Sequence, residues 1–206
     1  MADYIRDPDQ IRRASMAAVR AEVDLDAVPA DMTAVVLRLV HACAMPDIMG
    51  ELSFSPGAGA AGRDALLAGA PVLADCRMVA AGITRSRLPA DNEVICTLDH
   101  PAAADMAIRS GSTRSAAAVD LWREHLEGAV VAIGNAPTAL FRLLEMIAGG
   151  AGAPALIAAF PVGFIGAAES KDALIGTGAP HITLRGRRGG SGLAAAAVNA
   201  MAGDDL

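Results

Sequence analysis

The sequence predicts an α/β protein, a three-layer α/β/α sandwich with a mainly parallel sheet and with N-terminal helices that precede the strands. Five short apolar runs are continuous rather than alternating, which is typical of strands buried on both faces of a sheet. Helix-like segments separate most of these runs, and alternating strands and helices indicate a parallel sheet with helices on both faces. The 206 residues fit one domain, which we expect to span residues 1–206.

Each expected element has a local reason. Asp7 and Pro8 form an N-cap and first-turn pair, so a first helix begins there and runs toward Val23. Residues 29–31 open a second helix, and a small-residue segment at 57–62 continues as a helix that ends at Gly69. The apolar runs predict strands at 71–74, 93–98, 129–134, 155–162 and 181–186. Later helices are expected at 113–126, 137–147, 167–174 and 193–201.

Ligands of such folds bind beyond the carboxyl ends of the parallel strands. Those ends carry Asp75, 134–135, 161–163 and 185–186. The last of them begins the turn "RGRRGGSG" at 185–192, whose backbone N–H groups, with Arg187 and Arg188, could hold an anion. A plain flexible turn is the alternative, since the segment matches neither a P-loop nor the GxGxxG pattern.

Composition and charge argue against several classes of function. The net charge is −6, from 23 acidic and 17 basic residues, and aromatic residues make up 3%, so the chain lacks the basic and stacking character of nucleic-acid binders. No apolar stretch approaches the roughly 18 residues of a membrane span, and the charged start "MADYIRDPDQ" lacks an export signal. Cys43, Cys76 and Cys96 form no CxxC pair, so we expect buried free thiols in a cytoplasmic protein.

The second predicted helix contains "LRLVHACAM" at 37–45, in which Arg38 and His41 share one side of an otherwise apolar helix. A helix that is apolar on most sides is expected to be buried on most sides, which would place both residues in low-dielectric surroundings. A buried guanidinium needs an anion or several acceptors. Two explanations for Arg38 and His41 stay open: a structural pair bound by nearby protein groups, or a functional site.

Other candidate residues carry weaker signals. Ser15 shares the inner face of the first helix with Ile11 and Ala18, where a hydroxyl either bonds the preceding turn or contacts a ligand. The segments "TRSR" at 84–87 and "STRS" at 112–115 suit carboxylate binding or a solvated surface. No metal site is expected, because the remaining histidines lack metal-ligand spacing: His100, His125 and His181.

Several segments, taken in order, resemble the precorrin-8X methylmutase family of cobalamin biosynthesis. They are "LRLVHAC", "FSP", "AGAPVLADCRMVAAGITRSRLP", "NEVICTL", "STRSAAA", "VVAIGNAPTALFRLLE", "PVGFIGAAESKDAL" and "RGRRGGS". The resemblance runs from about Tyr4 to Asn199 and so covers nearly the whole chain. One departure is Ala44, where the family often has glycine after the cysteine, and we expect it to alter a helix end rather than the chemistry.

The resemblance implies an isomerase that requires no cofactor and no metal. Its substrate would be the tetrapyrrole precorrin-8X, in which a methyl group moves from carbon-11 to carbon-12 of ring C by a 1,5-sigmatropic shift to give hydrogenobyrinate. The family is a homodimer with its active site near the subunit interface, and the product is expected to pass to the next pathway enzyme. The family's catalytic histidine matches His41. The residues expected to bind substrate are Ser15, Arg38, Thr84, Arg114 and Lys171.

A methyl shift needs no nucleophile and no reductant, but it benefits from a proton or hydrogen bond given to a ring nitrogen. Histidine suits this role because its ordinary pKa lies near neutrality, and arginines would orient the substrate through its carboxylates. The cobalt-containing substrate of the anaerobic branch and a non-catalytic corrinoid carrier are alternatives. A nucleotide-dependent dehydrogenase or methyltransferase is a further alternative, which the absence of GxGxxG disfavours.

Overall fold

The sheet of the computed structural model contains six strands in the order β1-β6-β5-β4-β2-β3. Their bounds are β1 Leu52–Phe54, β2 Val72–Ala74, β3 Val94–Ile95, β4 Val130–Ile133, β5 Leu156–Ala159 and β6 His181–Leu184. β1 is antiparallel to β6, and every other neighbouring pair is parallel, which confirms the mainly parallel sheet. The structure describes residues 4–203. Residues 1–3 and 204–206, which belong to the predicted single domain 1–206, lie outside the described residues.

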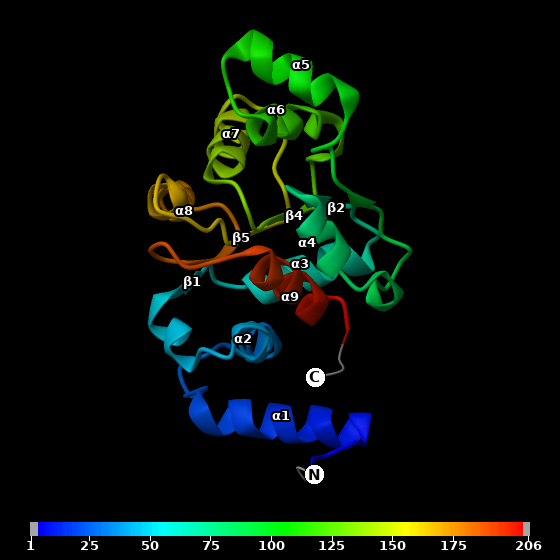
Figure 1. Cartoon of the computed structure of the whole chain (residues 1–206), viewed down its shortest axis with the longest axis vertical. Coiled ribbons are helices and arrows are strands. Elements are labelled where there is room, and N and C mark those ends of the chain that lie inside the picture. The colour runs from blue at the N-terminus through cyan, green and yellow to red at the C-terminus, as the bar shows by residue number, and fades with distance from the viewer. Residues whose placement is uncertain (1–3, 204–206) are drawn as a thin grey trace.

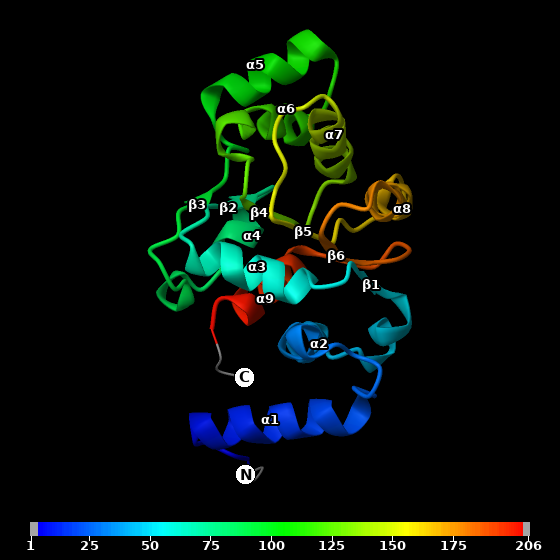
Figure 2. The same ribbon diagram turned by 180° about the vertical axis from the view of Figure 1, so that it is seen from behind.

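Helices cover both faces of this sheet (Figures 1 and 2). The α2 face carries α2 Ala30–Cys43, α3 Ala58–Leu67, α4 Arg77–Gly82 and α9 Ser191–Met201. The α7 face carries α6 Arg114–Asp120, α7 Pro137–Ala148 and α8 Ala167–Thr177, with α5 Pro101–Ser110 packed outside α6. α1, Pro8–Glu22, lies beyond α2 as an outer layer. Short 3-10 helices are η1 Pro46–Glu51, η2 Arg85–Arg87 and η3 Arg123–His125.

Successive side chains of the central strands supply two separate cores. Val72 and Ala74 pack into the core of the α2 face, whereas Leu73 packs into the core of the α7 face. Every residue of β2, β4, β5 and β6 is buried. The prediction that these continuous apolar runs are strands covered on both sides is therefore confirmed.

The winding of the sheet reverses between β2 and β4. The chain moves from β2 outward to β3 and then returns past β2 to β4. The carboxylate of Asp75, directly after β2, accepts hydrogen bonds from the N–H groups of Gly134, Asn135 and Ala136 at 2.9–3.0 Å, and so joins the end of β2 to the start of α7. Burial raises the pKa of this carboxyl, and the three N–H donors oppose the rise.

Several elements differ from the sequence prediction. The predicted strand 93–98 is reduced to β3, Val94–Ile95, and the helices α4 and α5 were not expected. β1 was not expected, because three partly buried residues at a sheet edge give no periodic signal. The predicted helix 113–126 breaks after Asp120 and resumes as η3. The predicted strand 155–162 ends at Ala159, and Pro161 follows, a residue that has no N–H for the ladder. Within residues 4–203, no helix combines the length and apolar character needed to cross a bilayer.

Candidate active site

The helix that carries Arg38 and His41 is buried along its body and ends at the surface. Its side chains from Met32 to Val40 are buried at six positions. The helix ends with Ala44 in the left-handed conformation, at φ 54° and ψ 33°, and the Ala44 N–H donates to the Val40 carbonyl at 2.8 Å. Glycine is the residue best suited to this position. The departure from the family pattern therefore acts on a helix end, as predicted.

His41 lies in the last turn of α2, and its side chain is exposed. The expectation that this residue sits in low-dielectric surroundings is therefore wrong, whereas Arg38 is half-buried with a buried Nε. The reason is geometric, because the core under α2 covers the helix body and leaves its C-terminal turn open. His41 borders two cavities, one toward α1 and the other toward α9.

The first cavity lies between α1 and α2 and has a volume of about 340 Å³. Ser15 borders it from α1, and His41 borders it from α2, so the structure brings these two predicted residues together. Ile11, which was expected on the same inner face as Ser15, is exposed instead. Met16 is the only buried residue among the described residues of α1, which packs on α2 as an outer layer.

The second cavity lies between α2, α4 and α9 and has a volume of about 240 Å³. Arg38 and His41 border it together with Gly82 and Asn199. Thr84 follows the end of α4, and its N–H donates to the Asn199 side-chain oxygen at 2.8 Å. The structure therefore connects Thr84, through Asn199, to the cavity that contains Arg38 and His41.

Lys171 is the only lysine of the chain and is fully buried on α8. Its Nζ donates to the carbonyl oxygen of Arg188 at 2.6 Å, and burial lowers the pKa of its ammonium group to about 8. Lys171 thus supports the turn 185–190 from inside the protein, on the opposite face of the sheet from α2. A direct contact between Lys171 and a substrate, which stays a prediction, requires this turn to move.

The arginines of that turn are already engaged by the protein. Two nitrogens of Arg188 donate to the Glu51 carboxylate at 2.7 and 3.0 Å, and a third donates to Asp47 at 2.6 Å. These carboxylates hold the pKa of Arg188 above its ordinary value, and the hydrogen bonds from Arg188 lower the pKa of Glu51. The guanidinium carbon of Arg187 lies 5.2 Å from the centre of the Phe164 ring, over which it stacks. The guanidinium of Arg188 is therefore bound by protein carboxylates, which favours a turn without a ligand over an anion-binding turn.

Arg114 is exposed at the start of α6, on the α7 face. The hydroxyl of Thr113 accepts a hydrogen bond from the Ala116 N–H at 3.1 Å and so caps this helix. The "STRS" motif therefore has a local structural role in starting α6. Within one chain, Arg114 lies on the other side of the sheet from His41.

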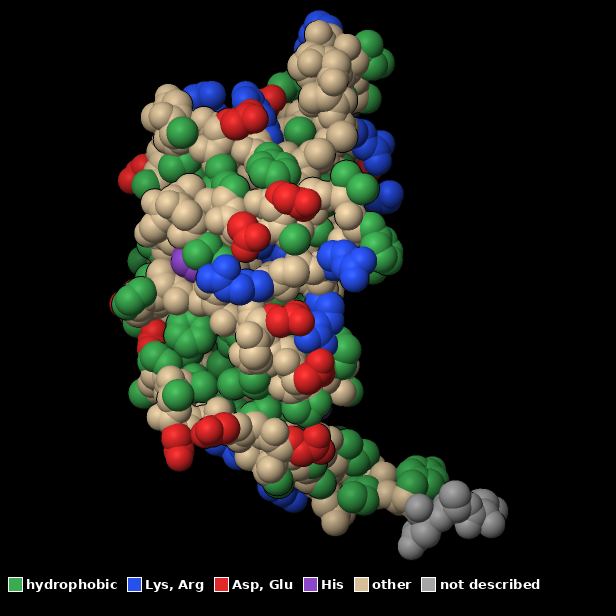
Figure 3. Space-filling view, turned by 90° about the vertical axis from the view of Figure 1, so that its left-hand side faces the viewer, with side chains coloured by type: hydrophobic (Ala, Val, Ile, Leu, Met, Phe, Trp, Pro, Cys, Tyr) green, Lys and Arg blue, Asp and Glu red, His purple; other side chains and the backbone are tan. Residues whose placement is uncertain are grey.

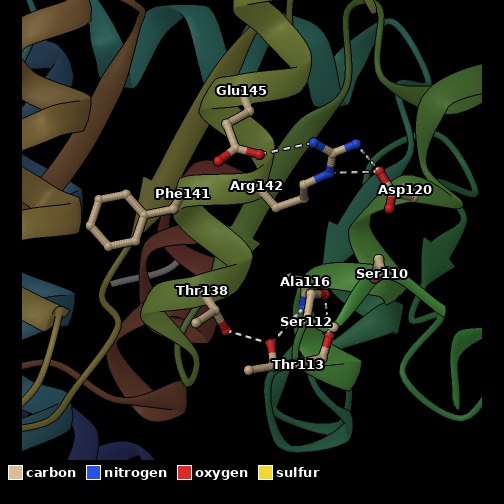
Figure 4. A pocket seen from close by; sticks show the side chains of 10 residues that line it. Ser110, Ser112, Thr113, Ala116, Asp120, Thr138, Phe141, Arg142 and Glu145 are labelled. Atoms are coloured by element: carbon tan, nitrogen blue, oxygen red, sulfur yellow. Dashed lines mark hydrogen bonds and ion pairs between the residues drawn. The ribbon is translucent and has the colours of Figure 1, made fainter. Parts of the chain in front are cut away.

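A third cavity, of about 730 Å³ and larger than the two beside His41, lies on the α7 face between α5, α6 and α7 (Figure 4). Arg142 donates to Asp120 through two nitrogens, each at 2.7 Å, and to Glu145 at 2.8 Å. Glu145 and Asp120 hold the pKa of Arg142 above its ordinary value. The charge of this arginine is thus compensated within the protein, and none of the six predicted site residues borders this cavity.

Charged side chains of both signs alternate across the middle of the face shown in Figure 3. A uniform basic surface of the kind that binds nucleic acid is not formed on this face. Among residues 4–203, no three His, Cys, Asp or Glu side chains are grouped so that they could hold a metal ion. All three cysteines are free, as predicted, but only Cys76 is buried as expected, whereas Cys43 and Cys96 are half-buried.

Comparison with known proteins identifies the family of this chain. The sequence profile described as precorrin-8X methylmutase matches residues 10–203. The chain belongs to the precorrin-8X methylmutase family. A precorrin-8X methylmutase of Pseudomonas aeruginosa is 60% identical over 98% of both chains. One from a Sinorhizobium species is 54% identical over 97% of this chain and 96% of that one.

The fold agrees with the same family. The crystal structure of a precorrin-8X methylmutase from Thermus thermophilus covers 94% of both chains with a TM-score of 0.86 and 39% identity. The protein is thus an isomerase of the methylmutase type with an α/β fold. Sequence reasoning pointed to Ser15, Arg38 and His41, which border the two cavities of the α2 face, but it did not single out Asn199, which borders one of them. No local signal marks that asparagine, since it lies 115 residues from Thr84 in the sequence.

Proposed function

We propose that this protein converts precorrin-8X into hydrogenobyrinate by moving a methyl group from carbon-11 to carbon-12 of ring C. The observation that supports this most is the position of His41 between two cavities, one bordered by Ser15 and the other by Arg38. An exposed imidazole at a helix end is accessible to a substrate as large as a tetrapyrrole. The two relatives at more than 50% identity carry the precorrin-8X name, which favours the metal-free substrate over the cobalt-containing one.

In this proposal His41 acts as the acid. It gives a proton, or a hydrogen bond, to a ring nitrogen of the macrocycle and takes it back after the methyl group has moved. The 1,5-sigmatropic shift breaks the bond to carbon-11 and forms the bond to carbon-12 within one molecule, so it consumes no oxidant or reductant. A well-placed general acid contributes about 10² to 10⁴ in rate.

Arg38, Ser15 and Thr84 are the proposed substrate-binding residues of the same site. Arg38 would form charge-assisted hydrogen bonds with substrate carboxylates, and the two hydroxyls would fix the orientation of the ring. Arg114 contributes in this proposal from a second copy of the chain, as the homodimer implies. The large exposed side chains of Phe164, 83% exposed, and Ile165, 89% exposed, support an interface with a second copy.

We also propose that residues 1–206 form one domain, which the family match over residues 10–203 supports. The three free cysteines support a cytoplasmic location, since reducing compartments keep thiols unpaired. Hand-over of hydrogenobyrinate to the next pathway enzyme is a further part of the proposal, which a pull-down with that enzyme tests.

The His41→Ala variant tests the proposal. We expect the spectral change that follows addition of precorrin-8X to slow by about 10²- to 10⁴-fold, while hydrogenobyrinate still binds. His125→Ala is the matched control, because His125 is also exposed but lies in η3 on the other side of the sheet. Turnover by His41→Ala at the rate of the unmodified protein contradicts the assigned acid.

Two further outcomes separate the alternatives. Faster turnover of cobalt-precorrin-8 than of precorrin-8X, measured side by side, would assign the protein to the cobalt branch. Tight binding of hydrogenobyrinate without turnover of either substrate would indicate a corrinoid carrier.

A further inference from the structure

Asn199 lies on α9 where this helix meets the end of α4, and its amide contacts the backbone on both sides of that end. The side-chain oxygen accepts a hydrogen bond from the Thr84 N–H at 2.8 Å, and the side-chain nitrogen donates to the Gly82 carbonyl at 2.9 Å. The oxygen and the nitrogen of the amide therefore each form a hydrogen bond. One side chain therefore holds the segment 82–84 at two points.

The end of α4 needs such a partner. α4 ends at Gly82, and the last carbonyl groups of a helix have no partner within it. Ala195 lies one turn before Asn199 on the same side of α9. A Cβ placed on Gly82 would lie 2.8 Å from the Ala195 Cβ, so glycine is what allows the two helices to approach this closely. This approach brings the Asn199 amide within reach of the α4 backbone.

Asn199 also borders the cavity that contains Arg38 and His41. Thr84 itself begins η2, and its side chain is exposed. We propose that Asn199 is a positioning residue, whose amide holds the Thr84 backbone so that the Thr84 hydroxyl meets a substrate carboxylate beside Arg38 and His41. This inference rests on the proposed function, because it takes Thr84 as a substrate-binding residue.

The chemistry of the amide sets the expected effect of each substitution. Asn199→Leu removes both hydrogen bonds at similar volume, so KM for precorrin-8X should rise about 3- to 10-fold, the range for one displaced substrate hydrogen bond. The kcat value should stay nearly constant, because His41 is untouched. Asn199→Asp keeps the acceptor for Thr84 but places an oxygen against the Gly82 carbonyl. Acidification protonates this carboxyl and restores a donor, so KM relative to the unmodified enzyme should fall again at low pH.

A double-mutant cycle separates positioning from a general loss of stability. Asn199→Leu is compared in the unmodified chain and in a Thr84→Ala chain, which keeps the backbone N–H but lacks the hydroxyl. If Asn199 acts through Thr84, its effect on KM disappears in the Thr84→Ala background. Asn92→Leu is the matched control, since the buried Asn92 amide bonds the carbonyls of Leu66 and Ala70 away from this cavity. That control should lower stability and leave KM unchanged.

Additive effects of Asn199→Leu and Thr84→Ala on KM would overturn the proposal. If Asn199→Leu does not fold, the pH series of Asn199→Asp replaces it, and a KM ratio that does not change with pH is the contrary result. Failure of the proposed function has a different signature, because the unmodified protein would not turn over precorrin-8X. In that case the Kd for hydrogenobyrinate replaces KM in the same four chains.

Discussion

The two faces of the sheet each carry an arginine beside a cavity, but they differ in what surrounds it. On the α7 face, Arg142 borders the cavity of about 730 Å³ and is bound by Asp120 and Glu145 of the same chain. On the α2 face, two smaller cavities share the exposed imidazole of His41, and Arg38 borders one of them. The proposed site therefore does not lie at the larger cavity. It lies where a histidine is accessible, because histidine is the residue type suited to proton exchange near neutral pH.

The largest effect on stability is expected for Asp75, whose carboxylate joins the end of β2 to the start of α7. Asp75→Ala leaves three N–H donors at the start of α7 without their acceptor, so the free energy of unfolding should fall by about 3 kcal/mol. Urea unfolding followed by circular dichroism measures the change. Asp75→Asn keeps one acceptor oxygen, so its free energy of unfolding should fall by less than that of Asp75→Ala. A loss below about 1 kcal/mol for Asp75→Ala would show that this joint is not important for stability.

The comparison of the two faces is tested by paired arginine variants. Arg38→Met should lower kcat/KM for precorrin-8X by about 10- to 100-fold, because it removes charge-assisted hydrogen bonds to the substrate. Arg142→Met, on the α7 face, should leave kcat/KM within about twofold, since that guanidinium is bound to protein carboxylates. Steady-state kinetics of both variants measures the two kcat/KM values. Equal losses on the two faces would contradict the placement of the site.

A smaller effect concerns the buried lysine of the α7 face. The pKa of Lys171 is lowered to about 8 in the folded protein from 10.5, so the unfolded chain binds more protons between these values. Stability should therefore rise as pH increases from about 8 to 10.5, because deprotonation removes the cost of a buried charge. Lys171 is the only lysine, so Lys171→Met should remove this rise. Thermal unfolding across that range measures it, and an unchanged slope in the variant refutes the assignment.

The smallest effect is expected at the end of α2. Ala44→Gly relieves a left-handed alanine but adds freedom to the unfolded chain, so a net gain of about 0.5 kcal/mol is expected, with kcat unchanged. Ala104→Gly, at an exposed position within α5, is the control and should lose about 1 kcal/mol. Loss of stability in Ala44→Gly would show that the left-handed alanine carries no strain.

Much of the fold was predictable from local pattern. The continuous apolar runs at β2, β4 and β5 could be recognised because strands covered on both faces are apolar at nearly every position. β1 could not be predicted, because its pairing with β6 joins residues more than 100 positions apart. For the candidate site, helical spacing alone grouped Arg38 with His41, whereas the burial of Lys171 and the exposure of His41 depend on how distant elements pack.

By itself the sequence determined which residue types are available for chemistry and on which local face they lie. Hydrophobic periodicity and helical spacing act over a few residues, so they can be read without knowledge of the packing. Only the tertiary structure decided which charges face solvent and which are already compensated. Burial and ion pairing join segments far apart in the chain, as Arg188 with Glu51 and Asn199 with Thr84 illustrate.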